Sequence, residues 1–446
     1  MEKEMKAIIL AAGKGSRVTE LCTSLPKCLL PVGNEPLIFY PLRMLQKAGF
    51  KDVLIVVADI YQDAIQKTLA NRFPMQIEYF DIPYNKDLAT ADSLRLVASK
   101  KRINEDVLVI SCDVVIDFDL LKLINFYRTH NPTLTAVVST SQIVTESSVP
   151  GRKGKGKLER DLIAVASNGK HRLLFLSAEA DFDDEVTLHK AILRKCPEFE
   201  IRSDFLDAHI YVIKKWVLNF LLENTQISSI KGELIPDLIR KQFKKVKHET
   251  KEGIRAGAPS SVDCKTHISE HFEGDDISKA LLRLQPGYEK GENVEPKIEC
   301  LAYLLHNQFC VRSNNILSYV EANKQLPRNM IEHSVTPSTP TSKAQIGPDC
   351  IIGKDTVFGD RCAVKKTVIG RNCNIQGKVK LVNCVVMDNV EIEENCSIQG
   401  SIICSGVHIG HSSEIKDCVI ASKQNVVAFA KFSNEVIMDV EHMMQL

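Results

Sequence analysis

The feature that most constrains the fold is a repeat in the last quarter of the chain. From Ile352 onward an apolar residue recurs in steps of six, six and five, so one full turn takes 17 residues. The residues in one register are Ile352, Ile369, Val386, Ile403 and Ile420. A helix or an isolated strand has a shorter period, whereas three short strands per turn, stacked on neighbouring turns, have this one. The repeat therefore predicts a parallel β-helix over residues 345–432, and the period leaves its hand open.

Two further ladders run beside this register. Each residue of this register is preceded by another β-branched residue. One position before that lies a small residue: Cys350, Thr367, Cys384, Ser401 and Cys418. Small side chains suit a tight corner of such a coil. We predict that the seven cysteines from Cys350 to Cys418 pack at corners, because a stacked ladder does not bring four zinc ligands to one point.

Residues 1–245 have a different pattern, in which short β-branched runs alternate with helical periods. Lys6–Leu10, Val53–Val57 and Val107–Ile110 are typical of buried strands, and Pro36–Ala48 and Gln62–Ala70 of helices. This alternation predicts an α/β domain with a doubly wound, mostly parallel sheet. Such sheets bind ligands at the carboxyl ends of their strands.

Composition separates the remaining parts and limits the classes of partner. Residues 246–296 carry few periodic apolar residues and are interpreted as a linker or partly disordered insertion, and residues 297–344 as a connecting segment. The net charge of +1 and the absence of an apolar run of ~18 residues argue against membrane or direct nucleic-acid partners. The 14 cysteines, with no C-x-x-C pair, favour a reducing cytosol.

The motif with the clearest chemical meaning follows the first predicted strand and reads LAAGKGSRVTELCTSLPKCLLPVG. Gly13 and Gly15 permit a tight turn whose backbone N–H groups approach a phosphate, and Arg17 and Lys27 add positive charge. The spacing excludes a Walker A loop, and Val18 stands where a dinucleotide fingerprint needs its third glycine. The motif predicts a nucleotide phosphate site.

This motif resembles the signature of sugar-phosphate nucleotidyltransferases, which join a sugar 1-phosphate to a nucleotide and release pyrophosphate. The resemblance implies a nucleotidyltransferase-like α/β domain followed by a left-handed β-helix. It also implies that Asp113 is a magnesium ligand and that Thr90, in Ala89–Ala91, belongs to the base-recognition motif. A GTP-type nucleotide and magnesium are the ligands to which these residues point.

Several positions depart from that family. Cys112 replaces the glycine before the metal-binding aspartate, and Glu20 replaces the proline that follows the signature arginine. The lysine of the E-K-P motif is missing from Leu174–Glu179. The second metal-binding aspartate is also missing, with Glu249 or Glu252 as the alternative carboxylate. Phosphoryl transfer depends on such charges, so we predict that nucleotidyl transfer is lost.

The departures leave two interpretations of each predicted site residue. The nucleotide-binding set is either vestigial or retained: Gly13, Gly15, Arg17, Lys27 and Thr90. Asp113 is either a metal ligand or a structural residue at a strand end. Thr90–Asp92 is either a helix N-cap or a base reader, and the basic run Arg152–Lys157 either a solvated loop or a contact for an acidic partner or RNA.

Longer stretches resemble a branch of the family, the nucleotidyltransferase-like subunits of eukaryotic translation initiation factor 2B. They include Pro26–Leu42, Val107–Asp117, Pro150–Ile163, Asp207–Leu221 and Ser228–Phe243. The resemblance implies a non-catalytic structural or regulatory subunit, with no required cofactor, that supports GDP/GTP exchange on initiation factor 2. Its partners would be the other subunits, chiefly epsilon. The resemblance implies that epsilon carries an extra helical domain after its β-helix. The given sequence stops at Leu446, soon after the last predicted coil, which favours the partner of epsilon over epsilon itself.

Two other functions stay open at this stage. The retained phosphate loop is also typical of an active mannose-1-phosphate guanylyltransferase. A regulatory partner of such an enzyme, which senses sugar nucleotide without turning it over, would share the same loop.

Overall fold

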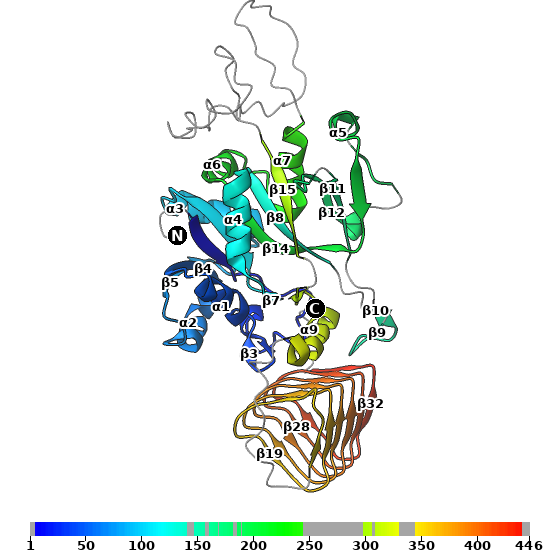
Figure 1. The fold of residues 1–446 in the computed structure, drawn as a ribbon. Helices are drawn as coiled ribbons and strands as arrows, with labels where there is room; N and C mark the ends of the chain where they lie inside the picture. Colours follow the sequence, from blue (N-terminus) through cyan, green and yellow to red (C-terminus); the bar gives the residue numbers. More distant parts are fainter. Residues whose placement is uncertain are drawn as a thin grey trace, which may run out of the picture.

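The computed structural model describes residues 5–140, 147–156, 160–167, 169–181, 185–188, 190–243, 298–305, 308–329 and 344–438. The predicted insertion 246–296 lies outside these ranges, and so do Glu249 and Glu252. Figure 1 shows a domain of sheet and helices above a β-helix, with one helix between them. None of the helices in the described ranges combines the length and apolar character needed to span a membrane.

The first domain is built on a seven-stranded sheet in the order β15-β8-β14-β6-β1-β4-β5. Its strands, in chain order, are β1 (Met5–Leu10), β4 (Asp52–Ala58), β5 (Gln76–Ile82), β6 (Asp106–Ser111), β8 (Leu134–Thr140), β14 (Phe205–Ile213) and β15 (Cys300–Leu305). Only β14 is antiparallel to its neighbours in this sheet, so the mostly parallel sheet is confirmed. The connecting segment contributes β15, which pairs with β8 at the edge of the sheet.

Helices cover both faces of this sheet, as the doubly wound prediction requires (Figure 1). One face packs against α1 (Phe39–Lys47), α2 (Gln62–Leu69) and α4 (Leu120–His130). The other packs against α3 (Thr90–Lys100), α6 (Lys215–Glu223) and α7 (Ile235–Lys241). The local signals are visible in α4, where the Asp119 side chain accepts from the N–H of Leu121 and Asn131 ends the helix in a left-handed conformation.

Smaller elements lie around the seven-stranded sheet (Figure 1). A three-stranded sheet contains β11 (Asp161–Ala166), β12 (Leu173–Ala178) and β13 (Phe199–Arg202), and α5 (Lys190–Lys195) lies near it. Three strand pairs complete the domain: β2 (Pro31–Val32) with β3 (Glu35–Pro36), β9 (Ser147–Ser148) with β10 (Lys155–Gly156), and β7 (Val114–Ile116) with β16 (Cys310–Arg312). The last pair leads into α9 (Ile316–Asn329).

The C-terminal part is a parallel β-helix with three sheets, as predicted. The β17 sheet contains β17 (Gln345–Ile346), β20 (Ala363–Lys365), β23 (Lys380–Val382), β26 (Ser397–Gln399), β29 (Glu414–Lys416) and β32 (Lys431–Ser433). The β18 sheet contains β18 (Ile351–Ile352), β21 (Val368–Ile369), β24 (Val385–Val386), β27 (Ile402–Ile403), β30 (Val419–Ile420) and β33 (Val436–Ile437). The β19 sheet contains β19 (Val357–Phe358), β22 (Asn374–Ile375), β25 (Glu391–Ile392), β28 (His408–Ile409) and β31 (Asn425–Val426).

The coil register and the corners agree with the sequence prediction. Ile352 pairs with Ile369, and Ile369 with Val386, so each turn takes 17 residues. The residue before four of the five small corner residues has a positive φ, for example 56° at Asn383, which turns the chain sharply. The Cys384 thiol lies 3.2 Å from the Val382 carbonyl oxygen and 3.4 Å from that of Ile398. The predicted corner packing of cysteine is confirmed there, but it is wrong for Cys404, which is buried in the apolar cluster between the β-helix and the first domain.

The β18 sheet presents a second ladder outward, and this ladder joins the two domains. Its members are Ile351, Val368, Val385, Ile402 and Val419, which cluster with residues of α9 and of the first domain. The backbone N–H of Gly33 donates to Asn323 of α9 at 3.0 Å, and the Tyr319 hydroxyl donates to the Pro31 carbonyl at 2.6 Å. The side-chain amide of Asn34 donates to the Ile369 carbonyl at 2.7 Å. We call this contact the domain seam.

Candidate functional site

The structure brings Lys27 and Asp113 together at the carboxyl ends of β1 and β6. Lys27 lies in a 3₁₀ turn, Lys27–Leu29, and Asp113 follows β6. Lys27 Nζ donates to Asp113 Oδ2 at 2.5 Å. The Lys27 side chain is 11% exposed and the Asp113 side chain 3%, so the ion pair is largely shielded from water.

A third charge completes this cluster, and the sequence did not predict it. Arg312 Nε lies 3.3 Å from Asp113 Oδ1, and the Ser111 hydroxyl donates to the same oxygen at 2.5 Å. Burial on its own raises the pKa of Asp113, but the charges of Arg312 and Lys27 outweigh it and hold that pKa well below its usual range. We call Lys27, Asp113 and Arg312 the ion cluster.

The ion cluster does not suit magnesium. A magnesium ion needs free carboxylate oxygens, and both oxygens of Asp113 already accept from cationic or hydroxyl donors. An incoming ion would also face the charges of Lys27 and Arg312. Among the described residues there is no group of three or more His, Cys, Asp or Glu side chains with a geometry that holds a metal. Lys27 and Arg312 thus neutralise the Asp113 carboxylate, which the family resemblance assigns to a metal ion.

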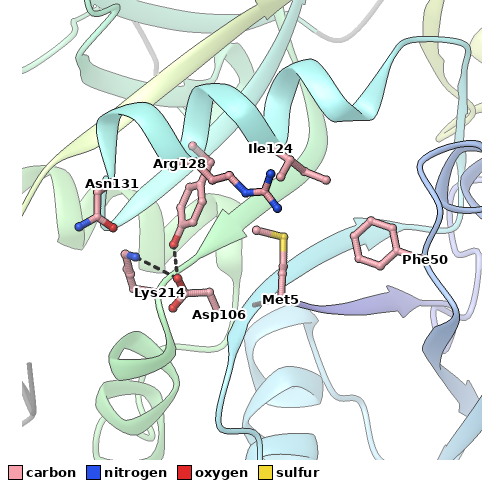
Figure 2. Close-up of a pocket in the computed structure, with 8 residues that line it drawn as sticks. Met5, Phe50, Asp106, Ile124, Arg128, Asn131 and Lys214 are labelled. Carbon is pink, nitrogen blue, oxygen red and sulfur yellow. Dashed lines mark hydrogen bonds and ion pairs between the residues drawn. The ribbon is translucent and has the colours of Figure 1, made fainter. Parts of the chain in front are cut away.

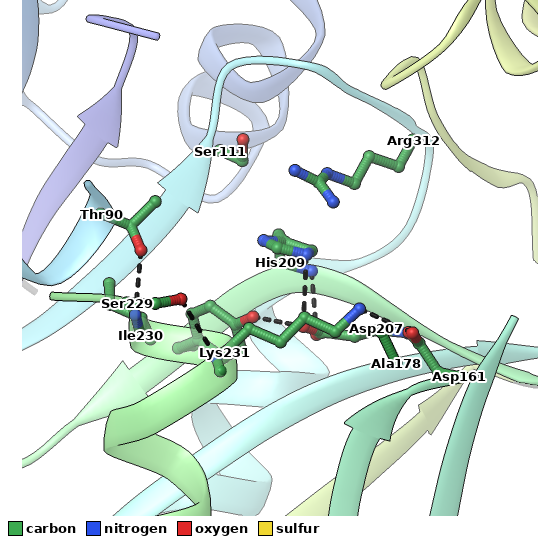
Figure 3. Close-up of polar contacts among 12 residues, drawn as sticks. Thr90, Ser111, Asp161, Ala178, Asp207, His209, Ser229, Ile230, Lys231 and Arg312 are labelled. Carbon is green, nitrogen blue, oxygen red and sulfur yellow. Dashed lines mark hydrogen bonds and ion pairs between the residues drawn. The ribbon is translucent and has the colours of Figure 1, made fainter. Parts of the chain in front are cut away.

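A second polar cluster lies beside the first and is shown in Figure 3. Lys231 Nζ donates to Asp161 Oδ1 at 2.7 Å, and the other oxygen of Asp161 accepts from the backbone N–H of Asp207 at 2.9 Å. Asp207 also accepts from the Tyr211 hydroxyl and from the backbone N–H of His209. Burial raises the pKa of Asp207 to about 6, although Lys231 and Tyr211 oppose the rise.

His209 occupies a strained position between the two clusters. Its φ of 52° is left-handed, and the register of β14 against β8 shifts between Asp207 and Tyr211 at this point. Burial, together with the charges of Arg312 and Lys231, lowers the pKa of His209 well below its ordinary value. The imidazole is therefore neutral at physiological pH. A pocket of about 100 Å³ opens here, lined by Asp161, Lys231 and Arg312 among others.

The predicted phosphate loop keeps a turn geometry but stands apart from these contacts. Gly15 has a φ of 73°, and a Cβ there would come within 3.0 Å of the Cys22 sulfur, so glycine is required. Gly13 and Arg17 are exposed to solvent. Lys27 is the residue of this motif that belongs to the ion cluster, where it pairs with Asp113. Binding of a GTP-type nucleotide by the loop stays a prediction.

Thr90 begins α3 and makes a structural contact. Its hydroxyl oxygen accepts from the backbone N–H of Ile230 at 2.9 Å, which ties α3 to a π-helical turn, Ile230–Leu234 (Figure 3). The Asp92 carboxylate accepts from the N–H of Ala89 at 3.3 Å and so caps the helix. The N-cap interpretation of Thr90–Asp92 matches these contacts, and base recognition by Thr90 stays a prediction.

The basic loop after β9 contacts the β-helix. The N–H of Gly151 donates to the Asp417 carbonyl at 2.8 Å, and Val149 is buried in the domain seam. The Arg152 side chain is mostly solvent-exposed and lies 3.8 Å from Glu20. Lys157 lies outside the described residues.

Sequence reasoning missed Arg312 and Lys231. Arg312 lies in the segment assigned as a connection between domains, and 199 positions separate it from Asp113. Lys231 pairs with Asp161, which lies opposite Ala178 on the neighbouring strand. Ala178 belongs to the segment from which the E-K-P lysine is missing. The available signal for Arg312 is its place after the short apolar run Phe309–Val311, whereas Lys231 follows the polar Ser228 and Ser229 and had no such signal.

A larger pocket of about 240 Å³ lies at the opposite, amino ends of β1 and β6 (Figure 2). Its central carboxylate, Asp106, accepts from the Tyr127 hydroxyl at 2.7 Å and from Lys214 Nζ at 2.9 Å. Asp106 also accepts from the backbone N–H of Lys215. These bonds join α4 and the start of α6 to the sheet, so the cluster has a structural explanation.

Family models match both domains. Residues 6–148 match the nucleotidyl transferase model, and residues 333–431 match the model of the left-handed β-helix (LbH) domain of eIF2B subunit epsilon. The predicted fold class, including the left-handed winding, is thereby confirmed. The domain boundaries at residues 245, 296 and 344 stay predictions.

Curated relatives show the same relationship along the whole chain. The gamma subunit of translation initiation factor eIF2B from Schizosaccharomyces pombe is 29% identical over 445 residues, covering 98% of this chain and 90% of the relative. The gamma subunit from Caenorhabditis elegans is 35% identical over 245 residues, covering 54% and 59%. The epsilon subunit from S. pombe is 26% identical over 247 residues, covering 54% and 36%. The predicted resemblance is confirmed at the level of the gamma subunits.

Proposed function

We propose that this chain, a homologue of the gamma subunits of translation initiation factor eIF2B, is a non-catalytic subunit of an eIF2B-type guanine nucleotide exchange complex. The support for a subunit role is the match to gamma subunits over 98% of the chain. Translation initiation takes place in the cytosol, which is therefore the proposed location.

The observation that carries the non-catalytic assignment is the ion cluster. In a nucleotidyl transfer the metal neutralises charge that develops on the phosphates. Here Arg312 and Lys27 occupy the Asp113 carboxylate, and the Lys27 ammonium that a phosphate would need is already paired. The cluster is satisfied within the chain, which suits a structural element better than a site that must bind a triphosphate.

The proposed partners are the other eIF2B subunits, with epsilon first, and initiation factor 2 as the protein on which exchange occurs. Support for epsilon comes from the match to an epsilon subunit at 26% identity over 54% of the chain and from the match of residues 333–431 to the epsilon family model. Related subunits commonly pair through equivalent surfaces. The first domain and the β-helix would then serve as packing surfaces.

The experiment that tests the non-catalytic assignment is a pyrophosphate-release assay on the purified chain. We expect no release from GTP and mannose 1-phosphate with magnesium, at concentrations where an active guanylyltransferase gives a strong signal. The matched variant is Arg17→Ala, since Arg17 is exposed and belongs to the predicted phosphate loop. Magnesium-dependent release by the wild type that Arg17→Ala abolishes would overturn the assignment.

A further inference from the structure

Positive charge is concentrated on residues 361–380 of the β-helix, which include the strands β20 and β23. Residues 361–380 contain six Lys or Arg residues and no Asp or Glu, whereas residues 381–400 contain four Asp or Glu residues and no Lys or Arg. Charge is thus segregated along the solenoid and is not mixed as on an ordinary protein surface.

Five of these six cations are exposed and lie on or beside the β17 sheet: Arg361, Lys365, Lys366, Lys378 and Lys380. We call them the basic patch. Lys365 and Lys380 lie at outward positions of β20 and β23, because their neighbours Val364 and Leu381 are buried inside the coil. Arg361 and Lys378 occupy the same corner position one turn apart. The sixth cation, Arg371, belongs to the domain seam, where it donates to the carbonyl of Asn34.

No ion pair within the described part of the chain neutralises the basic patch. None of its five side chains forms an ion pair with a described residue, and the exposed neighbour Asp360 does not pair with them either. Later coils of the same sheet behave differently, since Lys431 on β32 lies 3.4 Å from Glu414 on β29. The β18 sheet forms the domain seam, and all five side chains of the patch are exposed, so the first domain does not cover the patch.

The spacing of the patch suits an extended acidic peptide. Diagonal neighbours on adjacent strands, such as Lys365 and Lys380, lie about 7–8 Å apart at their backbones. Alternate side chains of an extended strand lie on one side at a similar spacing, about 6.5–7 Å apart. Two or three carboxylates of one peptide can therefore reach the patch together.

Nucleic acid fits the patch less well. Five cations are fewer than the roughly 6–10 phosphate contacts of a strongly salt-dependent DNA-binding protein. No aromatic residue lies among them on which a base could stack. We propose that the basic patch is a docking surface for a carboxylate-rich segment of another protein.

The test measures binding of fluorescein-labelled octaglutamate to the full chain by fluorescence anisotropy. The key variant is Lys365→Glu with Lys380→Glu, which we expect to weaken binding about tenfold or more. Wild-type binding should also weaken between roughly 50 and 200 mM salt. The β-helix supplies a matched control in Lys416→Glu with Lys431→Glu, which lie at the same registers of the same sheet three turns later. This control has the same change in net charge and should weaken binding about threefold at most.

A neutral variant guards against misfolding of the charge reversal. Lys365→Gln with Lys380→Ser introduces the residues that the coil already carries at these registers, Gln399 and Ser397. It should also weaken peptide binding, with an unchanged melting temperature. Equal losses in the patch and control variants, no binding by the wild type, or tighter binding of octauridylate RNA than of the peptide would each overturn the proposal.

Discussion

Replacing Asp113 by alanine is expected to destabilise the folded chain by about 3–5 kcal/mol, the cost of leaving buried charges unpaired. The Asp113 side chain is 3% exposed, and its removal leaves Lys27 and Arg312 facing each other without a carboxylate. In a site built for a metal, the opposite effect would follow, because clustered carboxylates repel one another until the metal binds. The change in the free energy of unfolding, from urea denaturation without added metal, measures this difference.

Two controls make the Asp113 result specific. Asp117 pairs with Lys47 at 3.0 Å on the surface, so Asp117→Ala should cost about 1 kcal/mol or less. Combining Asp113→Ala with Arg312→Met removes one of the stranded cations and should restore part of the lost stability. A loss for Asp113→Ala no larger than that for Asp117→Ala would show that the ion cluster has no structural role.

Replacing Ile402 by aspartate is expected to uncouple the two domains. Ile402 is fully buried on the outward face of the β18 sheet, in the cluster that contains Tyr319 and Leu326 of α9. The desolvation of a carboxylate in this apolar seam costs several kcal/mol. The inward ladder that includes Ile403 is untouched, so the β-helix itself should stay folded.

Calorimetry distinguishes this outcome from general unfolding. The wild type should unfold with its two domains coupled through the seam, and Ile402→Asp should separate the transitions by several degrees. Val357→Asp is the matched control, because Val357 lies on the same β-helix and is 63% exposed. Identical calorimetric profiles for the two variants would contradict the role assigned to the seam.

The β-helix was predictable in detail because its interior apolar residues recur at a fixed period in the sequence. Every turn must bury an equivalent residue, so Ile352 and Ile369 could be aligned by counting before any contact was known. The outward residues, such as Val368 and Val385, were visible in the same count, but their purpose was not. They pack against α9 and the first domain, and the identity of a packing partner leaves no period in the sequence.

The candidate site was predictable only in part, for a related reason. Lys27 and Asp113 belong to motifs that a family resemblance can locate, and the structure places them in contact. Arg312 belongs to no such motif and reaches Asp113 because β16 pairs with β7. A pairing of strands nearly two hundred residues apart depends on the whole fold. The ion cluster therefore became apparent only in three dimensions.

The measurement that tests the account most directly is affinity purification of the tagged chain from cell extract at near-physiological salt, followed by quantitative mass spectrometry. A subunit of an exchange complex is expected to recover the other eIF2B subunits in stoichiometric amounts, with epsilon among them. Recovery of the chain alone, or together with sugar-nucleotide enzymes, would contradict the account.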